Sequence, residues 1–233
     1  MGHPMNASLH LLNAVLMIAI PLALGAWIAH RYGQRWALFG MGAVSFLGAQ
    51  VVHLPLLGAL TYLLRSVDPP IVRMHASLIN AVVLGLAAGV CEEVARYLVY
   101  RFLARDARSW ASGLMLGAGH GGTEAILLGL WAGATVIHAA ALPIAGPTVM
   151  LGAIERVFAL ANHLALSLIV LQAFVRRAGV WLLAAIGWHA ALDAVSVYGA
   201  HTMSPFALEA VIGIFAIAAV GVILALRPAR ATA

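Results

Sequence analysis

Seven apolar runs, each long enough to cross a lipid bilayer, divide this chain of 233 residues. A helix needs about 20 apolar residues to span the hydrocarbon core of a membrane. The runs lie at roughly 7–29, 37–63, 76–100, 111–140, 148–174, 178–200 and 205–226. Because 64% of the residues are hydrophobic and only 9% are charged, polar side chains are too few to cover a globule in water. We therefore predict an all-α, polytopic membrane protein with about seven transmembrane helices in a single integral-membrane domain, residues 1–233.

The arginines indicate how the predicted helices are oriented. All 13 basic residues are arginine, and most follow the first, third, fifth and last runs: Arg31, Arg35, Arg101, Arg105, Arg108, Arg176, Arg177, Arg227 and Arg230. Since cytoplasmic connections carry the excess of basic residues, we expect a prokaryotic inner-membrane protein with its N-terminus outside and its C-terminus in the cytoplasm. The 64–75 connection, with Arg65, Arg73 and Asp68, is an exception. Arginines scattered between apolar runs also exclude a nucleic-acid partner, which requires a dense basic surface.

The second apolar run is interrupted by His53 and Pro55. Proline removes a backbone donor and kinks or ends a helix. We therefore expect this run to contain a re-entrant or kinked piece.

Ionisable side chains remain inside four consecutive predicted helices, the third to the sixth. They are Glu92, Glu93 and Arg96, then His120 and Glu124, then Glu155, Arg156 and His163, then His189 and Asp193. An ionisable group at membrane depth costs about 2.5 kcal/mol or more unless it is paired or hydrated. So many of them imply a shared polar cavity, and we predict a catalytic helical core over residues 76–200.

Four of these groups lie at one predicted depth. Glu92, His120, His163 and His189 are about 8 to 11 residues from the arginine-rich ends of their helices, or roughly 12 to 17 Å at a rise of ~1.5 Å per residue. They therefore form one layer, which we expect to open toward the cytoplasmic side. Each has a polar residue four positions on, one turn away on the same helix face: Arg96, Glu124, Ser167 and Asp193.

A row of small residues accompanies His120 in the fourth predicted helix: Gly113, Gly117, Gly121, Ala125, Gly129 and Gly133. Such a row lets a neighbouring helix approach closely and brings His120 and Glu124 within its reach. The alternative is that the glycines only pack helices and His120 only satisfies a backbone carbonyl. Glu155 and Arg156 fit a structural pair that locks helices together.

The layer has the groups needed for hydrolysis. Of two adjacent carboxylates beside an arginine, the one paired with Arg96 stays ionised, and the other is available as a general base that activates water. One imidazole can hold that water, and a second can donate a hydrogen bond to the oxyanion of a tetrahedral intermediate. This predicts an intramembrane endopeptidase that cleaves a membrane-associated peptide or protein.

Four ordered motifs carry a family resemblance: CEEVARY (91–97), GAGHGGTEAI (117–126), IERVFALANHLALS (154–167) and WHAALD (188–193). The chain resembles the YhfC family of intramembrane proteases, which is related to the CAAX-processing type II proteases of the CPBP (Abi) superfamily and to PrsW-type proteases. The resemblance covers about residues 76–200. It implies that Glu92 is the water-activating base, that Glu93 supports it and that His120 helps to hold the water. PrsW-type proteins carry a glutamate in the second motif, so Glu124 can share or take that role.

The remaining motifs imply two more site positions. His189 resembles the histidine of the oxyanion site, and His163 resembles the third-motif position. The arginine follows the glutamates by one residue fewer than in the usual EExxxR pattern, and Asp193 replaces the asparagine of the prenyl-protein proteases. Since an ionised Asp193 cannot donate to an oxyanion, we expect it to orient His189 or to stay protonated.

A metal mechanism is the alternative to a glutamate mechanism. His120, His163, His189 and a glutamate offer enough ligands for a catalytic zinc ion. No HExxH pair exists, because Gly121 follows His120, and the single cysteine, Cys91, excludes a multi-cysteine site. The related enzymes are regarded as glutamate-dependent, so we expect no cofactor and a metal-free mechanism, with zinc as the alternative.

Two other function classes fit a buried polar layer. Glutamate, histidine and aspartate chains also relay protons in proton-coupled transporters, and a scaffold of the same fold can keep the cavity without activity. A transporter typically has paired broken helices in two related halves, whereas here the polar groups fall in consecutive helices.

Overall fold

The computed structural model describes residues 3–66, 76–138 and 146–228. Seven α-helices occur in this part of the chain: α1 (His3–Tyr32), α2 (Trp36–Ser66), α4 (Ala76–Phe102), α5 (Trp110–His138), α6 (Leu151–Val175), α7 (Val180–Thr202) and α8 (Pro205–Ala225). A short 3-10 helix, η1 (Gly146–Met150), precedes α6, and the described ranges contain no strand. The all-α prediction is confirmed. The side chains of four charged residues named above lie outside what the structure describes: Arg65, Asp68, Arg73 and Arg230.

The second helix is continuous. Pro55 lies inside α2, which runs without a break from Trp36 to Ser66. The expectation of a re-entrant piece at His53 and Pro55 is therefore wrong. A proline is tolerated in a membrane helix when neighbouring groups satisfy the freed backbone carbonyl.

Six helices are long and apolar enough to cross a membrane, namely α1, α2, α4, α6, α7 and α8. The fourth helix in the chain, α5, is not among these six, and it carries several glycines together with His120 and Glu124. Its first half lies inside the bundle, where residues 112–122 are all buried. Protein rather than lipid therefore surrounds the polar part of α5.

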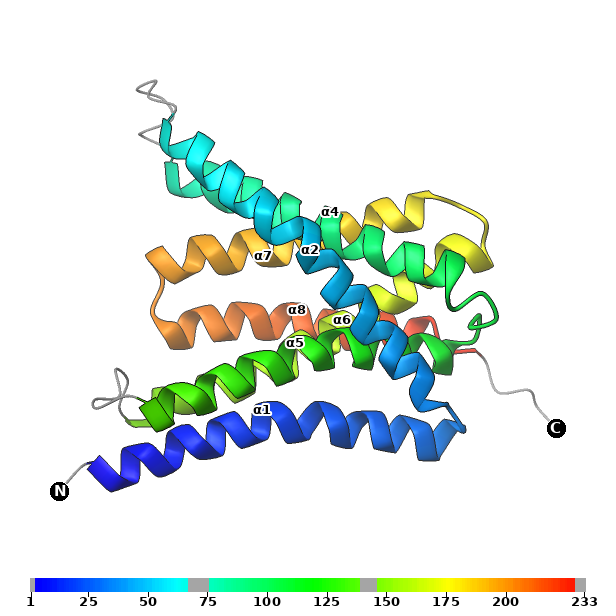
Figure 1. The fold of residues 1–233 in the computed structure, drawn as a ribbon. Helices are drawn as coiled ribbons and strands as arrows, with labels where there is room; N and C mark the ends of the chain where they lie inside the picture. Colours follow the sequence, from blue (N-terminus) through cyan, green and yellow to red (C-terminus); the bar gives the residue numbers. More distant parts are fainter. Residues whose placement is uncertain (1–2, 67–75, 139–145, 229–233) are drawn as a thin grey trace.

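The helices form a bundle in which α5 and α6 are central (Figure 1). α1 packs along α5, α2 crosses both α5 and α4, α4 packs along α7, and α8 packs on α6. The arginine-bearing connections 33–35, 103–109 and 176–179 lie at one end, together with the end of α8 (Figure 1). There Trp110 of α5 donates to the carbonyl of Ile223 at 2.9 Å, and Arg227 lies over the Trp110 ring. We call this the arginine-rich end and the other the arginine-poor end.

Glycines permit the close helix crossings that position the polar groups. A side-chain carbon on Gly42 of α2 or Gly119 of α5 would collide with the backbone of the facing helix. Gly117 and Gly121 let α6 approach, because a Cβ at Gly121 would lie 2.6 Å from Cδ2 of His163. The second half of the small-residue row, at Gly129, instead receives α1. The close approach predicted from the row is confirmed, with two different helices as partners.

Candidate functional site

The four groups expected at one depth meet in the centre of the bundle. Nε2 of His120 lies 3.0 Å from Oε2 of Glu92, and Nε2 of His189 lies 3.8 Å from the same oxygen. The His163 ring stands between the other two imidazoles, with centroids 5.0 Å from His120 and 5.7 Å from His189. α4, α5, α6 and α7 thus each contribute one side chain to a single cluster, as counting from the helix ends predicts.

The two adjacent glutamates of α4 have different environments. Glu93 pairs with Arg96, and both side chains are fully buried. Glu93 also lies 2.7 Å from Nδ1 of His189, so its carboxylate accepts the Nδ1–H of that ring. Arg96 therefore forms its ion pair with Glu93, three residues before it, and not with Glu92, four residues before it. Glu92 is left to face the histidines.

Each residue of the layer has a polar residue four positions on, and of these pairs only His189 and Asp193 are in contact in the described part of the chain. Nε2 of His189 lies 3.6 Å from Oδ2 of Asp193. His120 and Glu124 each bond to residues of other helices instead. Residues four apart on a helix share a face, but a closely packed neighbour that offers a charged group takes the contact.

Helix α2 supplies residues that a search for ionisable groups misses. Ser45 lies 2.7 Å from Nδ1 of His120 and donates to the carbonyl of Gly42, also at 2.7 Å. Gln50 donates to Oε1 of Glu92 at 3.1 Å. The signal for them was the occurrence of a hydroxyl and an amide within an apolar run. Neither carries charge, so the cost of burial did not single them out.

These hydrogen bonds define the tautomer of His120. The carbonyl of Gly42 can only accept, so the Ser45 hydrogen is used there and Nδ1 of His120 must donate to the Ser45 oxygen. In the neutral ring Nε2 then carries a lone pair, which faces the Glu92 carboxylate at 3.0 Å. Two acceptors at this distance require a proton or a cation between them. A donor Nδ1–H held by a second group is also the usual arrangement of a metal-binding histidine.

A second polar chain links α5 to α6. Oε1 of Glu124 accepts from Arg156 at 2.6 Å, and Oε2 accepts from Nε2 of His163 at 2.8 Å. Arg156 pairs with Glu155 as well. The other nitrogen of His163, Nδ1, lies 3.2 Å from Arg96. Arg156 therefore locks two helices together, as expected, but its interhelical partner is Glu124.

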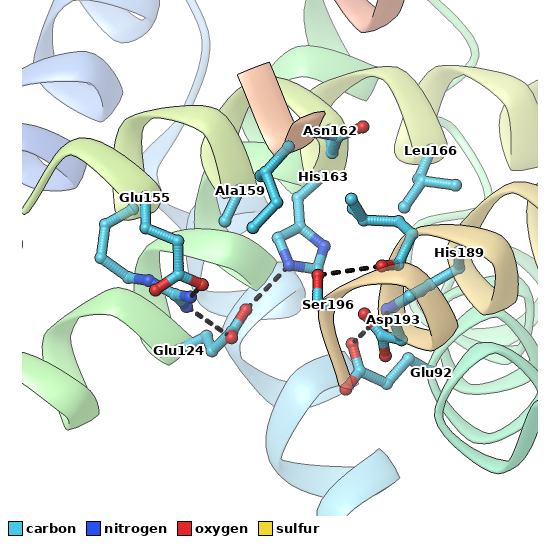
Figure 2. A pocket seen from close by; sticks show the side chains of 13 residues that line it. Glu92, Glu124, Glu155, Ala159, Asn162, His163, Leu166, His189, Asp193 and Ser196 are labelled. Atoms are coloured by element: carbon cyan, nitrogen blue, oxygen red, sulfur yellow. Dashed lines mark hydrogen bonds and ion pairs between the residues drawn. The ribbon is translucent and has the colours of Figure 1, made fainter. Parts of the chain in front are cut away.

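The cluster borders a cavity of about 90 Å³, which has room for a few water molecules. Glu92, Glu124, His163, His189 and Asp193 line it (Figure 2). His120 is fully buried behind Glu92 and is not part of the lining. Of the two candidates in the second motif, Glu124 is therefore the side chain that reaches the cavity.

The cavity extends away from the arginine-rich end. Most of its other lining residues, including Glu155, Ala159 and Ser196, lie on the arginine-poor side of the histidine layer. On the opposite side, Tyr100 is fully buried and bonds to Ser167 at 2.8 Å, within the apolar core of the bundle. The cavity therefore does not extend toward the arginine-rich end, where the sequence predicts the opening, because bulky side chains fill that half of the bundle.

Three of these groups have the spacing of metal ligands. One ligand atom each from Glu92, His120 and His163 lies within 4.8 Å of the other two. Glu92 and His120 fit as they stand, whereas His163 must exchange its contact with Arg96 or with Glu124 to offer a lone pair. His189, the other histidine of the expected zinc set, is not part of this compact group. The donor set of two imidazoles and one carboxylate matches that of catalytic zinc sites.

Comparisons with known proteins agree on one family. The sequence model of the family described as YhfC intramembrane metalloprotease matches residues 16–146 and 133–216. A Bacillus subtilis (strain 168) protein described as uncharacterized membrane protein YhfC is 32% identical, over 80% of this chain and 82% of the relative. No solved structure matches the chain. The chain therefore belongs to the YhfC family of intramembrane metalloproteases.

Proposed function

We propose that the protein is an intramembrane endopeptidase that cleaves a membrane-associated peptide or protein at the cavity beside Glu92. The observation that carries this proposal is the contact of Glu92 with His120, 3.0 Å apart, at the wall of a water-sized cavity inside a membrane bundle. Buried groups of this kind are costly in a membrane and are typically retained for function. The family description supports a protease.

The cofactor proposal changes with these findings. The expectation of no cofactor finds no support, since the family is described as a metalloprotease and the donor set fits zinc. We propose that Glu92, His120 and His163 hold the metal ion. When bound, such an ion supplies a Lewis acid that activates water and polarises the scissile carbonyl.

The other residues of the site have roles that follow from their positions. Asp193 and Glu124 line the cavity and are placed to accept a proton from water. His189 is held through Nδ1 by Glu93, so its Nε2 points to the cavity side, toward Glu92 and Asp193. This positions His189 to exchange a proton with the reacting groups. Arg96 neutralises Glu93 and thereby keeps that support in place.

A metal-free glutamate mechanism is the second candidate. Glu92 lines the cavity and Gln50 fixes its other oxygen, so its carboxylate is positioned to take a proton from water directly. In this version His189 acts at the oxyanion, as the resemblance implies. The resemblance gives the water-holding role to His120, but His163 lines the cavity and His120 does not, so we propose that His163 holds the water.

The test uses a fluorogenic membrane peptide and the purified protein in liposomes. Glu92→Gln should abolish cleavage and reduce the bound metal, whereas Asp106→Asn, the same change at an exposed carboxylate of the α4–α5 connection, should alter neither. A chelator should abolish wild-type cleavage, and added zinc should restore it. Cleavage by chelated, metal-free protein would refute the metal mechanism and favour the glutamate one.

The competing function classes give different outcomes in the same preparation. Proton or solute flux across the liposomes without any cleavage would indicate a carrier. Neither flux nor cleavage, with a folded protein, would indicate a scaffold. Unchanged cleavage by Glu92→Gln would refute the proposed site.

We also propose that the arginine-rich end is cytoplasmic, in a prokaryotic inner membrane. The shared end of the arginine-bearing connections supports this orientation (Figure 1). The catalytic cavity then extends toward the outer face.

A further inference from the structure

A second, larger cavity lies at the arginine-poor end of the bundle. Its volume is about 680 Å³, and its wall is mostly apolar, formed by residues of α1, α5, α6, α7 and α8 such as Ala132, Leu151 and Leu208. Pockets of about 300–1,000 Å³ are typical of sites that enclose a ligand. Glu155 lines both this cavity and the catalytic one. Glu155 therefore borders both cavities, and the larger one lies next to the site on its arginine-poor side.

Around this junction three carboxylates face one arginine, and His10 of α1 also lines the larger cavity. Arg156 is the cation that Glu124 and Glu155 share, and Glu209 of α8 adds a third carboxylate to the wall of the larger cavity. Oε2 of Glu209 is buried, and no described residue bonds to it. The side chain as a whole is only partly buried, but a carboxylate oxygen without a partner at membrane depth is still costly. A cationic group that enters the cavity would relieve this cost.

We propose that the larger cavity binds the substrate segment on one side of the scissile bond, an apolar peptide stretch with a cationic group that pairs with Glu155 and Glu209. The inference rests on the proposed peptidase function. Glu155 and His163 are eight residues apart on α6, so about 12 Å separates the two levels. An extended peptide covers this length in about three or four residues. The cation therefore sits about three or four residues from the cleaved bond.

The test is a series of apolar fluorogenic peptides in which one lysine moves a position at a time. Each peptide has a norleucine counterpart of similar chain length without the charge. Acetylated and free N-termini distinguish a lysine side chain from an α-amino group as the source of the cation. We expect kcat/KM to be about tenfold higher for the cationic peptide at the matching position. A tenfold change corresponds to about 1.4 kcal/mol.

Variants of Glu155 and Glu209 test whether these two side chains produce the preference for lysine over norleucine. Glu209→Gln and Glu155→Gln should each reduce the ratio of lysine to norleucine kcat/KM toward one, whereas Asp106→Asn should retain it. Glu209→Arg should reverse the preference, in favour of a peptide with aspartate at the same position. A wild-type protein that cleaves both members of each pair equally, or a preference that survives in both glutamine variants, would overturn the inference.

A binding measurement separates this inference from the proposed function. Fluorescence anisotropy of labelled lysine and norleucine peptides compares their affinities without any cleavage. Tighter binding of the lysine peptide to the wild type than to Glu209→Gln, without cleavage, would support the cavity and refute the peptidase. Equal binding of both peptides would overturn the cavity assignment, and cleavage would then stand without it.

Discussion

Replacing Ser45 with alanine removes the hydroxyl that holds Nδ1 of His120, 2.7 Å away. Both residues are almost completely buried, so no water takes the place of the lost oxygen without rearrangement. The Nδ1–H is left without an acceptor, which costs about 1–3 kcal/mol for a buried donor. The imidazole also loses the contact that aims its Nε2 at Glu92. Residues that orient a metal-binding histidine typically contribute 10–100-fold to metal affinity or activity.

We therefore expect Ser45→Ala to weaken zinc binding and to lower kcat/KM by about 10–100-fold. Zinc affinity is measured by competition with a chromophoric chelator, and kcat/KM with the fluorogenic membrane peptide. Ser167→Ala is the matched control, because its buried hydroxyl bonds to Tyr100 at 2.8 Å, away from the metal set. Unchanged zinc affinity in Ser45→Ala, or an equal loss in Ser167→Ala, would refute the assigned tautomer and the support of His120 from α2.

Two further predictions concern packing and orientation. Gly121→Ala places a Cβ 2.6 Å from Cδ2 of His163, and overpacking of this kind costs about 1–3 kcal/mol. For Gly121→Ala we expect thermal inactivation at a lower temperature and reduced cleavage. The control is Gly187→Ala, where no atom lies within 4 Å of the added carbon, and it should behave like the wild type. Identical behaviour of the two variants would contradict the close packing. A fluorescent protein fused to the C-terminus should fluoresce in bacterial cells, and alkaline phosphatase fused to the N-terminus should be active. The opposite pattern would reverse the orientation.

Much of the fold could be read from hydropathy. All seven predicted runs correspond to α-helices, because a bilayer imposes both the length of a spanning segment and the internal satisfaction of its backbone. The re-entrant piece expected at Pro55 is absent, since the local rule that proline interrupts a helix is weaker than the requirement that a membrane segment stay hydrogen-bonded.

The candidate site was partly predictable for the same reason. Ionisable residues are conspicuous in apolar sequence, and counting from helix ends placed Glu92, His120, His163 and His189 in one layer. Their individual partners were not predictable. The contacts of His163 with Arg96 and Glu124, and of His120 with Ser45, depend on which helices cross and at what rotation.

The sequence by itself determined a helical membrane bundle, the depth of its polar layer and the residue types available for hydrolysis. Only the tertiary structure decided that Glu93 rather than Glu92 pairs with Arg96, that α2 completes the site, and that the cavity extends to the arginine-poor end. The physical reason is that hydropathy and helical rise act along a single chain segment. Side-chain pairing and cavity shape instead depend on close crossings between segments, which glycines permit and bulky residues prevent.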